Sequence, residues 1–154
     1  MKKRYDWVER TLFILFSYAH ITDWEVSSSE RTIIQRKTED IFKIIVGDLS
    51  KHPPDILEKK LTRAYNYWQK LEQISIDEVI AELQEVSTNI ISQKWFTPDF
   101  AEQLIGFLGE VAKADGVILD SEKWFITPLG RSITSSFLNP TFGYQIALKT
   151  KNFD

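Results

Sequence analysis

The chain has 154 residues, 43% of them hydrophobic and 13% aromatic, and a formal net charge of −3. This length and apolar content predict one folded domain with a real core and exclude a disordered tail. The chain is slightly acidic, and its only basic cluster is residues 2–4. It is therefore unsuited to nucleic-acid binding, and the cluster is too short to bind a membrane surface by charge alone. The absence of cysteine excludes disulfides, zinc ribbons and thiol chemistry, and it suits a cytoplasmic protein.

Hydrophobic periodicity is helical along most of the chain. A first helix is expected at about residues 5–22, and its apolar residues reach almost all the way round, which is typical of a central, buried helix. A second is expected at about residues 28–46, with Gly47 as its stop. The two prolines of "SKHPPD" then interrupt the pattern, because proline cannot continue a helix. A third helix is expected at about residues 55–71.

Two helix starts in the middle of the chain have recognisable capping residues. Ser75 and Glu78 match a capping box, in which the serine caps one free amide and the glutamate reaches back to another. A fourth helix is expected from Ser75 to about residue 93. Thr97 and Pro98 then predict a fifth helix, with a capping threonine and a proline in the first helical position.

The fifth helix is expected to end at the Asp-Gly turn of residues 115–116, and a sixth is expected at about residues 120–135. Apolar residues alternate over residues 142–148, which suggests an extended tail packed on the helices, or one more short helix. The chain is therefore expected to be one all-α domain over residues 1–154, a compact helical bundle. Its core spans about residues 8–135 and its tail residues 136–154. The apolar run near the start is far short of a membrane span.

Two stretches of the chain carry the same spaced pair of carboxylates. In "TDWEVSSSE" Asp23 is followed by Glu30, and in "KADGVILDSE" Asp115 is followed by Glu122 at the same separation. Each stretch is the short link between an apolar helix and the helix after it. The first and last helical hairpins therefore look like two pseudo-symmetric copies of one unit, with the third and fourth helices between them.

The paired acids have an ordinary explanation in helix capping. An Asp-Gly turn ends helices, the helix dipole favours a glutamate in a first turn, and Ser27 with Glu30 could form a capping box. Two observations count against this explanation. Asp23 and Asp115 lie at the carboxyl ends of helices, where the dipole disfavours an anion. Leu119 stands where Ser27 stands in the first copy, and leucine cannot cap.

A divalent cation would give the acids a separate role. Carboxylates across a tight turn are hard oxygen ligands suited to calcium, magnesium or manganese. If the two hairpins meet, four carboxylates could share one site, and their charges would repel strongly without a counter-charge. The candidate metal ligands are Asp23, Glu30, Asp115 and Glu122. His20 could add a ligand, although a lone histidine on an apolar helix is more often a packed residue.

The same stretches carry a family resemblance. "AKADGVILDSE" resembles the signature of the TerB-like family of tellurite-resistance-associated proteins, an Ala-x-Ala-Asp-Gly core with an acidic residue seven positions after the aspartate. "AHITDWEVSSSE" is similar to the family's first, matching copy, so that the resemblance spans roughly residues 8–135. The first copy departs from the pattern, because Trp24 replaces the usual glycine and Thr22 the usual alanine.

The resemblance implies a compact all-α domain with two pseudo-symmetric halves and acidic positions suspected of binding a metal ion, here Asp23, Glu30, Asp115 and Glu122. It also implies a bacterial cytoplasmic role linked to tellurite and other chemical stress, beside membrane partners. A related domain occurs in some co-chaperones.

Three functions are therefore open. The preferred one is a non-enzymatic TerB-like module that binds a divalent ion, inserts into no membrane and contacts other proteins, including membrane-associated ones. The second is a plain helical interaction domain, co-chaperone-like, in which the acids only cap and solvate turns. The third is a metal-dependent hydrolase, which is the weakest because no general base and no substrate-orienting arginine cluster is visible. No catalytic residue is assigned.

Overall fold

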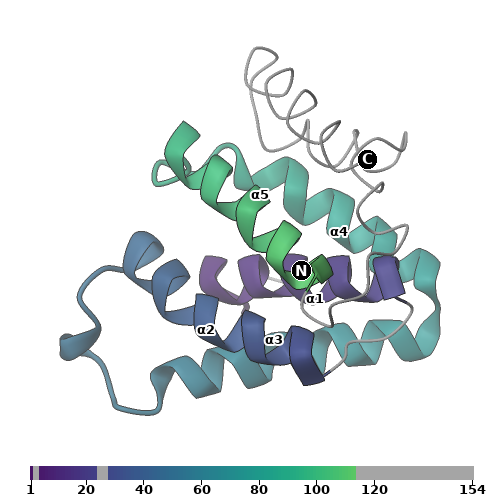
Figure 1. Cartoon of the computed structure of the whole chain (residues 1–154), viewed down its shortest axis with the longest axis horizontal. Helices are drawn as coiled ribbons and strands as arrows, with labels where there is room; N and C mark the ends of the chain where they lie inside the picture. The colour runs from purple at the N-terminus through teal and green to yellow at the C-terminus, as the bar shows by residue number, and fades with distance from the viewer. Residues whose placement is uncertain (2–3, 24–27, 114–154) are drawn as a thin grey trace.

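The fold is all-α, as the periodicity predicts. The structure is a computed structural model of the chain, and it describes residues 1, 4–23 and 28–113 (Figure 1). These residues form five α-helices and one short 3₁₀ helix, and they contain no strand. The elements are α1 (Trp7–Asp23), α2 (Ser28–Ile45), η1 (Leu49–Lys51), α3 (Ile56–Ile74), α4 (Ile76–Ile90) and α5 (Pro98–Lys113).

Helix α1 is the centre of the bundle, and the prediction of a central, buried first helix is confirmed. It contacts α2, α3, α4 and α5, and Figure 1 shows it in purple between them. Eight of its apolar side chains are buried: Val8, Leu12, Phe13, Ile14, Leu15, Phe16, Tyr18 and Ala19. Burying a large apolar side chain contributes about 1.5–3 kcal/mol, so α1 supplies much of the energy that holds the other four helices together.

The four outer helices follow each other around α1. Helix α2 contacts α3, α3 contacts α4, and α5 returns to lie against α2. Helices α1 and α5 are the ones that precede the two acidic motifs. They pack on each other, and both pack on α2.

The predicted helix ends are mostly confirmed. Gly47 ends α2 with a φ of +113°, and its N–H donates to the carbonyl of Phe42 at 3.2 Å. Thr97 caps α5, because the N–H of Phe100 donates to its hydroxyl at 3.1 Å. Helix α4 ends at Ile90, about three residues earlier than predicted, since the amides of residues 92 and 93 bond back only three positions and form turns.

Ser75 corrects one detail of the predicted capping box. Its hydroxyl accepts from the N–H of Glu78 at 3.2 Å, as expected. Its own N–H, however, donates to the carbonyl of Leu71 at 3.1 Å and closes the last turn of α3. The predicted return bond from Glu78 is therefore wrong, because the amide it would reach already terminates the preceding helix. Helix α3 accordingly runs to Ile74, about three residues beyond the prediction.

The predicted sixth helix, the extended segment at residues 142–148 and the Asp115–Gly116 turn lie outside the described residues. Of the two predicted pseudo-symmetric hairpins, the structure describes α1 and α2 of the first and α5 of the second. In the described part of the chain, every helix is too short or too polar to cross a lipid bilayer.

Candidate functional site

The first acidic motif lies at the junction of α1 and α2. Asp23 is the last residue of α1, and Glu30 is the third residue of α2. The Glu30 side chain is fully buried, with 0% of its surface exposed. A glutamate that only caps a helix or answers its dipole can stay in water, as the exposed first-turn residues Glu58 and Glu78 do. The burial of Glu30 therefore argues against the solvated-turn explanation for this residue.

The helical period explains why Glu30 points inward. Ile34, Thr38 and Ile41 follow it at intervals of four, four and three residues, and all three are buried. Glu30 is thus the first member of the stripe that α2 turns toward the core. A carboxylate taken out of water is costly unless hydrogen bonds or an opposite charge compensate it. Glu30 therefore needs a compensating partner, and a bound cation would be one such partner.

Helix α5 is fixed against α2 near the end that leads into the second motif. Lys37 on α2 forms an ion pair with Glu110 on α5, with Nζ and Oε2 3.0 Å apart. The same ammonium group lies 5.0 Å from the centre of the Phe107 ring. Lys37 is two helical turns beyond Glu30, or about 10 Å along α2. The last turn of α5 is therefore held on the helix that opens with Glu30.

The four predicted ligands are described to different extents. The structure places the side chain of Glu30 and the position of Asp23 at the end of α1. Asp115 and Glu122 lie outside the described residues, two and nine positions after the end of α5 at Lys113. Within the described part of the chain, no three histidine, aspartate or glutamate side chains gather closely enough to hold a metal ion. A shared four-carboxylate site stays a prediction.

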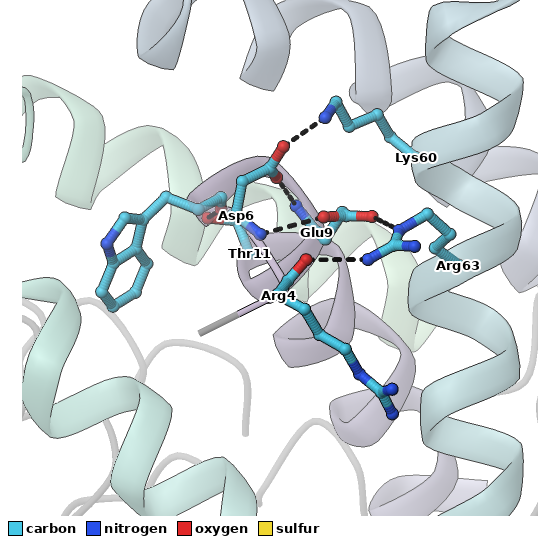
Figure 2. A network of polar contacts seen from close by, with 7 residues as sticks. Arg4, Asp6, Glu9, Thr11, Lys60 and Arg63 are labelled. Carbon is cyan, nitrogen blue, oxygen red and sulfur yellow. Dashed lines mark hydrogen bonds and ion pairs between the residues drawn. The ribbon is translucent and has the colours of Figure 1, made fainter. Parts of the chain in front are cut away.

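A second polar cluster, which the sequence analysis missed, lies at the opposite end of α1 (Figure 2). Asp6 and Glu9 form a complete capping box. The N–H of Glu9 donates to Asp6 Oδ1 at 2.9 Å, and the N–H of Asp6 donates to Glu9 Oε1 at 2.9 Å. The sequence signal was present, since Asp-x-x-Glu before an apolar helix has the spacing of a capping box.

Cations from α3 complete this cluster. Arg63 donates through Nε to Glu9, whose side chain is only 3% exposed, and through Nη2 to the carbonyl of Arg4 at 2.8 Å. Lys60 pairs with Asp6. The hydrogen bond to Glu9 is the main cause that raises the pKa of Arg63 above its ordinary value. Asp6 and Glu9 are thus both held by a backbone amide and a cation, which is the arrangement of a structural clamp rather than of a catalytic base.

His52 is the one histidine whose side chain the structure describes. His52 lies in the proline loop, where its ring packs edge-on against Phe42 with centroids 5.0 Å apart. One side of the His52 ring therefore rests on the core. His20 belongs to α1, and its proposed part in metal binding stays a prediction.

No protein-family model matches the chain, and no curated protein and no solved structure is significantly similar to it. The observations available on this protein are thus its all-α bundle around α1 and its buried Glu30. The TerB-like resemblance stays a prediction that depends on the two acidic motifs.

Proposed function

We propose that the chain is a non-enzymatic TerB-like helical domain that binds a divalent cation through its two acidic motifs and acts by contacting other proteins. The observation that carries this proposal is the complete burial of Glu30, the one predicted ligand whose side chain the structure describes. A buried carboxylate at a helix junction offers the hard oxygen donor that calcium, magnesium or manganese prefers.

The packing of the described helices supports a shared site. Helices α1 and α5 lead into the two motifs, and both lie against α2, which opens with Glu30. In this proposal Asp23 and Glu30 from the first hairpin, with Asp115 and Glu122 from the second, would hold the ion. The cation would supply the positive charge that lets several carboxylates stay close together. It would also join the two hairpins, so that loss of the ion loosens the domain.

The wider role follows from the resemblance. We infer a bacterial cytoplasmic function in the response to tellurite and other chemical stress, in which the domain contacts proteins that are themselves associated with the membrane. The alternative is a plain helical interaction domain without a metal ion. The Lys37–Glu110 pair favours neither, because it would fix α5 on α2 in both cases.

The test is a thermal unfolding series of chelator-treated protein with calcium, magnesium, manganese or zinc. An ion at a hundred times its dissociation constant adds about 2.7 kcal/mol to the free energy of unfolding. For a chain of this length that raises Tm by roughly 5–10 °C. Wild type is compared with Glu30→Gln, Asp115→Asn and Glu122→Gln, which keep side-chain size and remove one charge each. Glu58→Gln, at an exposed first-turn position of α3, is the matched control.

An increase of this size in wild type and in Glu58→Gln, absent from the three motif variants, would support the metal site. Absence of any increase at millimolar concentrations would overturn it and leave the plain interaction domain. An increase that the three motif variants retain would place the ion elsewhere and also contradict the proposal. Turnover of phosphoester or ester substrates by the metal-loaded protein would instead favour the hydrolase.

A further inference from the structure

The residues that precede α1 form a short strap across α3. We define this strap as residues 4–6, which are Arg4, Tyr5 and Asp6. Three side chains on one face of α3 hold it: Lys60, Arg63 and Tyr67. Their spacing of three and four residues places them one above another along the helix. Figure 2 shows Lys60 and Arg63 reaching from α3 toward Asp6, Glu9 and Arg4.

At the centre of the strap, the Tyr5 ring lies close to the guanidinium groups of Arg4 and Arg63. The Tyr5 ring lies 4.9 Å from Cζ of Arg63 and 5.3 Å from Cζ of Arg4. The same ring packs on Tyr67 with centroids 4.8 Å apart. Tyr67 in turn packs edge-on against Phe13, which belongs to the core and is fully buried. The strap therefore covers an aromatic surface that continues into the core.

Arg63 binds α1 and the strap at the same time. Its Nε binds the buried carboxylate of Glu9 inside α1, and its Nη2 binds the Arg4 carbonyl in the strap. Only a planar guanidinium has donors in the right directions for both. The Arg63 side chain itself is 49% exposed, so that solvent, salt and anions can reach it.

The contacts of the strap are weaker than those of the bundle. Exposed ion pairs contribute little and are screened by salt, whereas α1 is held by buried apolar side chains on all sides. Segments with few buried apolar contacts open at free energies well below that of global unfolding. We propose that residues 4–6 are a strap that Arg63 locks onto α3. The strap opens while the bundle stays folded, and its opening uncovers the Tyr67 ring, which packs on Phe13.

Hydrogen exchange of backbone amides tests this device. In Arg63→Gln the exchange of the Asp6, Glu9 and Arg10 amides should accelerate roughly ten- to a hundredfold, the worth of a hydrogen bond to a charged group. The amides of α4 should keep their wild-type rates. Lys59→Gln is the matched control, because it removes an exposed cation of the same helix whose partner is Asp55 rather than the strap.

A second variant distinguishes the hydrogen bond from Arg63 to the strap from the general contribution of Arg63 to stability. Arg63→Lys keeps a positive charge for Glu9 but cannot also reach the Arg4 carbonyl with a fixed fork. Arg63→Lys should therefore open the strap, but it should accelerate the amide exchange of Glu9 and Arg10 less than Arg63→Gln does. In wild type, 1 M salt should move the exchange of the strap toward that of the variants, since salt screens its exposed pairs.

Two results would overturn the proposal. One is equal acceleration in α4 and at the strap, which would mean that Arg63 supports the whole fold and no local opening exists. The other is unchanged exchange at residues 5–10 in both Arg63 variants, which would mean that the strap is held without the lock. The metal experiment does not bear on this outcome, because the strap lies at the other end of α1 from the acidic motif.

Discussion

Four glutamates of the described chain are each the third residue of a helix, and three of them, Glu9, Glu30 and Glu78, can be compared by their surroundings. These three lie in α1, α2 and α4. Glu9 is 2% exposed and Glu30 0%, whereas Glu78 is exposed. The helix dipole and the capping box favour an acid at all three positions. The comparison teaches that this local preference explains why a glutamate is tolerated there, and that the packing decides what it does.

The contacts of Glu9 and Glu78 show two different surroundings. Glu9 completes its capping box with Asp6 and meets Arg63 across the helix interface. Glu78 donates its amide to the Ser75 hydroxyl, while its side chain stays in solvent because the Ser75 amide closes α3. Glu30 heads a buried stripe, and burial sets it apart from a solvated capping residue.

The largest effect is expected at Glu9. Glu9→Ala removes a capping contact, worth about 1 kcal/mol, and the hydrogen bond to Arg63, worth about 1.5–3 kcal/mol. The free energy of unfolding should fall by about 2–4 kcal/mol, or roughly 5–15 °C in Tm. Urea denaturation measures it, and a double-mutant cycle with Arg63→Ala should give a coupling of about 1 kcal/mol or more. A loss below about 0.5 kcal/mol would show that Glu9 and Glu78 are energetically alike, and the comparison would fail.

A smaller effect is expected at the start of α4. Ser75→Ala removes the cap and should cost about 1 kcal/mol. Glu78→Ala should stay within about 0.5 kcal/mol of wild type, since an exposed side chain without a return bond contributes little. Both are measured by the same urea titration. If Glu78→Ala costs as much as Ser75→Ala, the Glu78 side chain does make the return bond of the capping box in solution.

The smallest effect is a pH dependence under the strap. Burial is the main cause that raises the pKa of Tyr67 above its ordinary value, with a further contribution from Tyr5. The folded protein therefore holds the phenol proton more tightly than the unfolded chain does. The stability that Tyr67 contributes is complete below about pH 10 and is lost as the pH rises through the raised pKa.

Tyr67→Phe removes the phenol and keeps the ring contacts with Tyr5 and Phe13. Between pH 9 and pH 11 the variant should lose less stability in urea denaturation than wild type loses. Equal losses in the two proteins would show that the Tyr67 phenol is as accessible as in an unfolded chain, and the covered aromatic surface would not exist.

Much of the fold was predictable from the sequence because its signals are local. The apolar period of α1, the proline at the start of α5 and the glycine after α2 act within a few residues of where they stand. The inward position of Glu30 was also readable, since it lies four residues before Ile34 in the apolar stripe. The Asp6–Glu9 capping box had a clear spacing and was overlooked.

The sequence by itself determined the five described helices, their caps and the central place of α1, because helical hydrogen bonds and apolar periodicity connect residues at most four or five positions apart. Only the tertiary structure decided which charges meet. Arg63 is 54 residues from Glu9, and Lys37 meets Glu110 across two helices. Such pairs depend on how α1, α2, α3 and α5 cross, and no local pattern encodes that crossing. The apolar stripe of α2 already pointed Glu30 inward, and the helices packed around it complete its burial, whereas Glu78 at the same helix position of α4 is exposed.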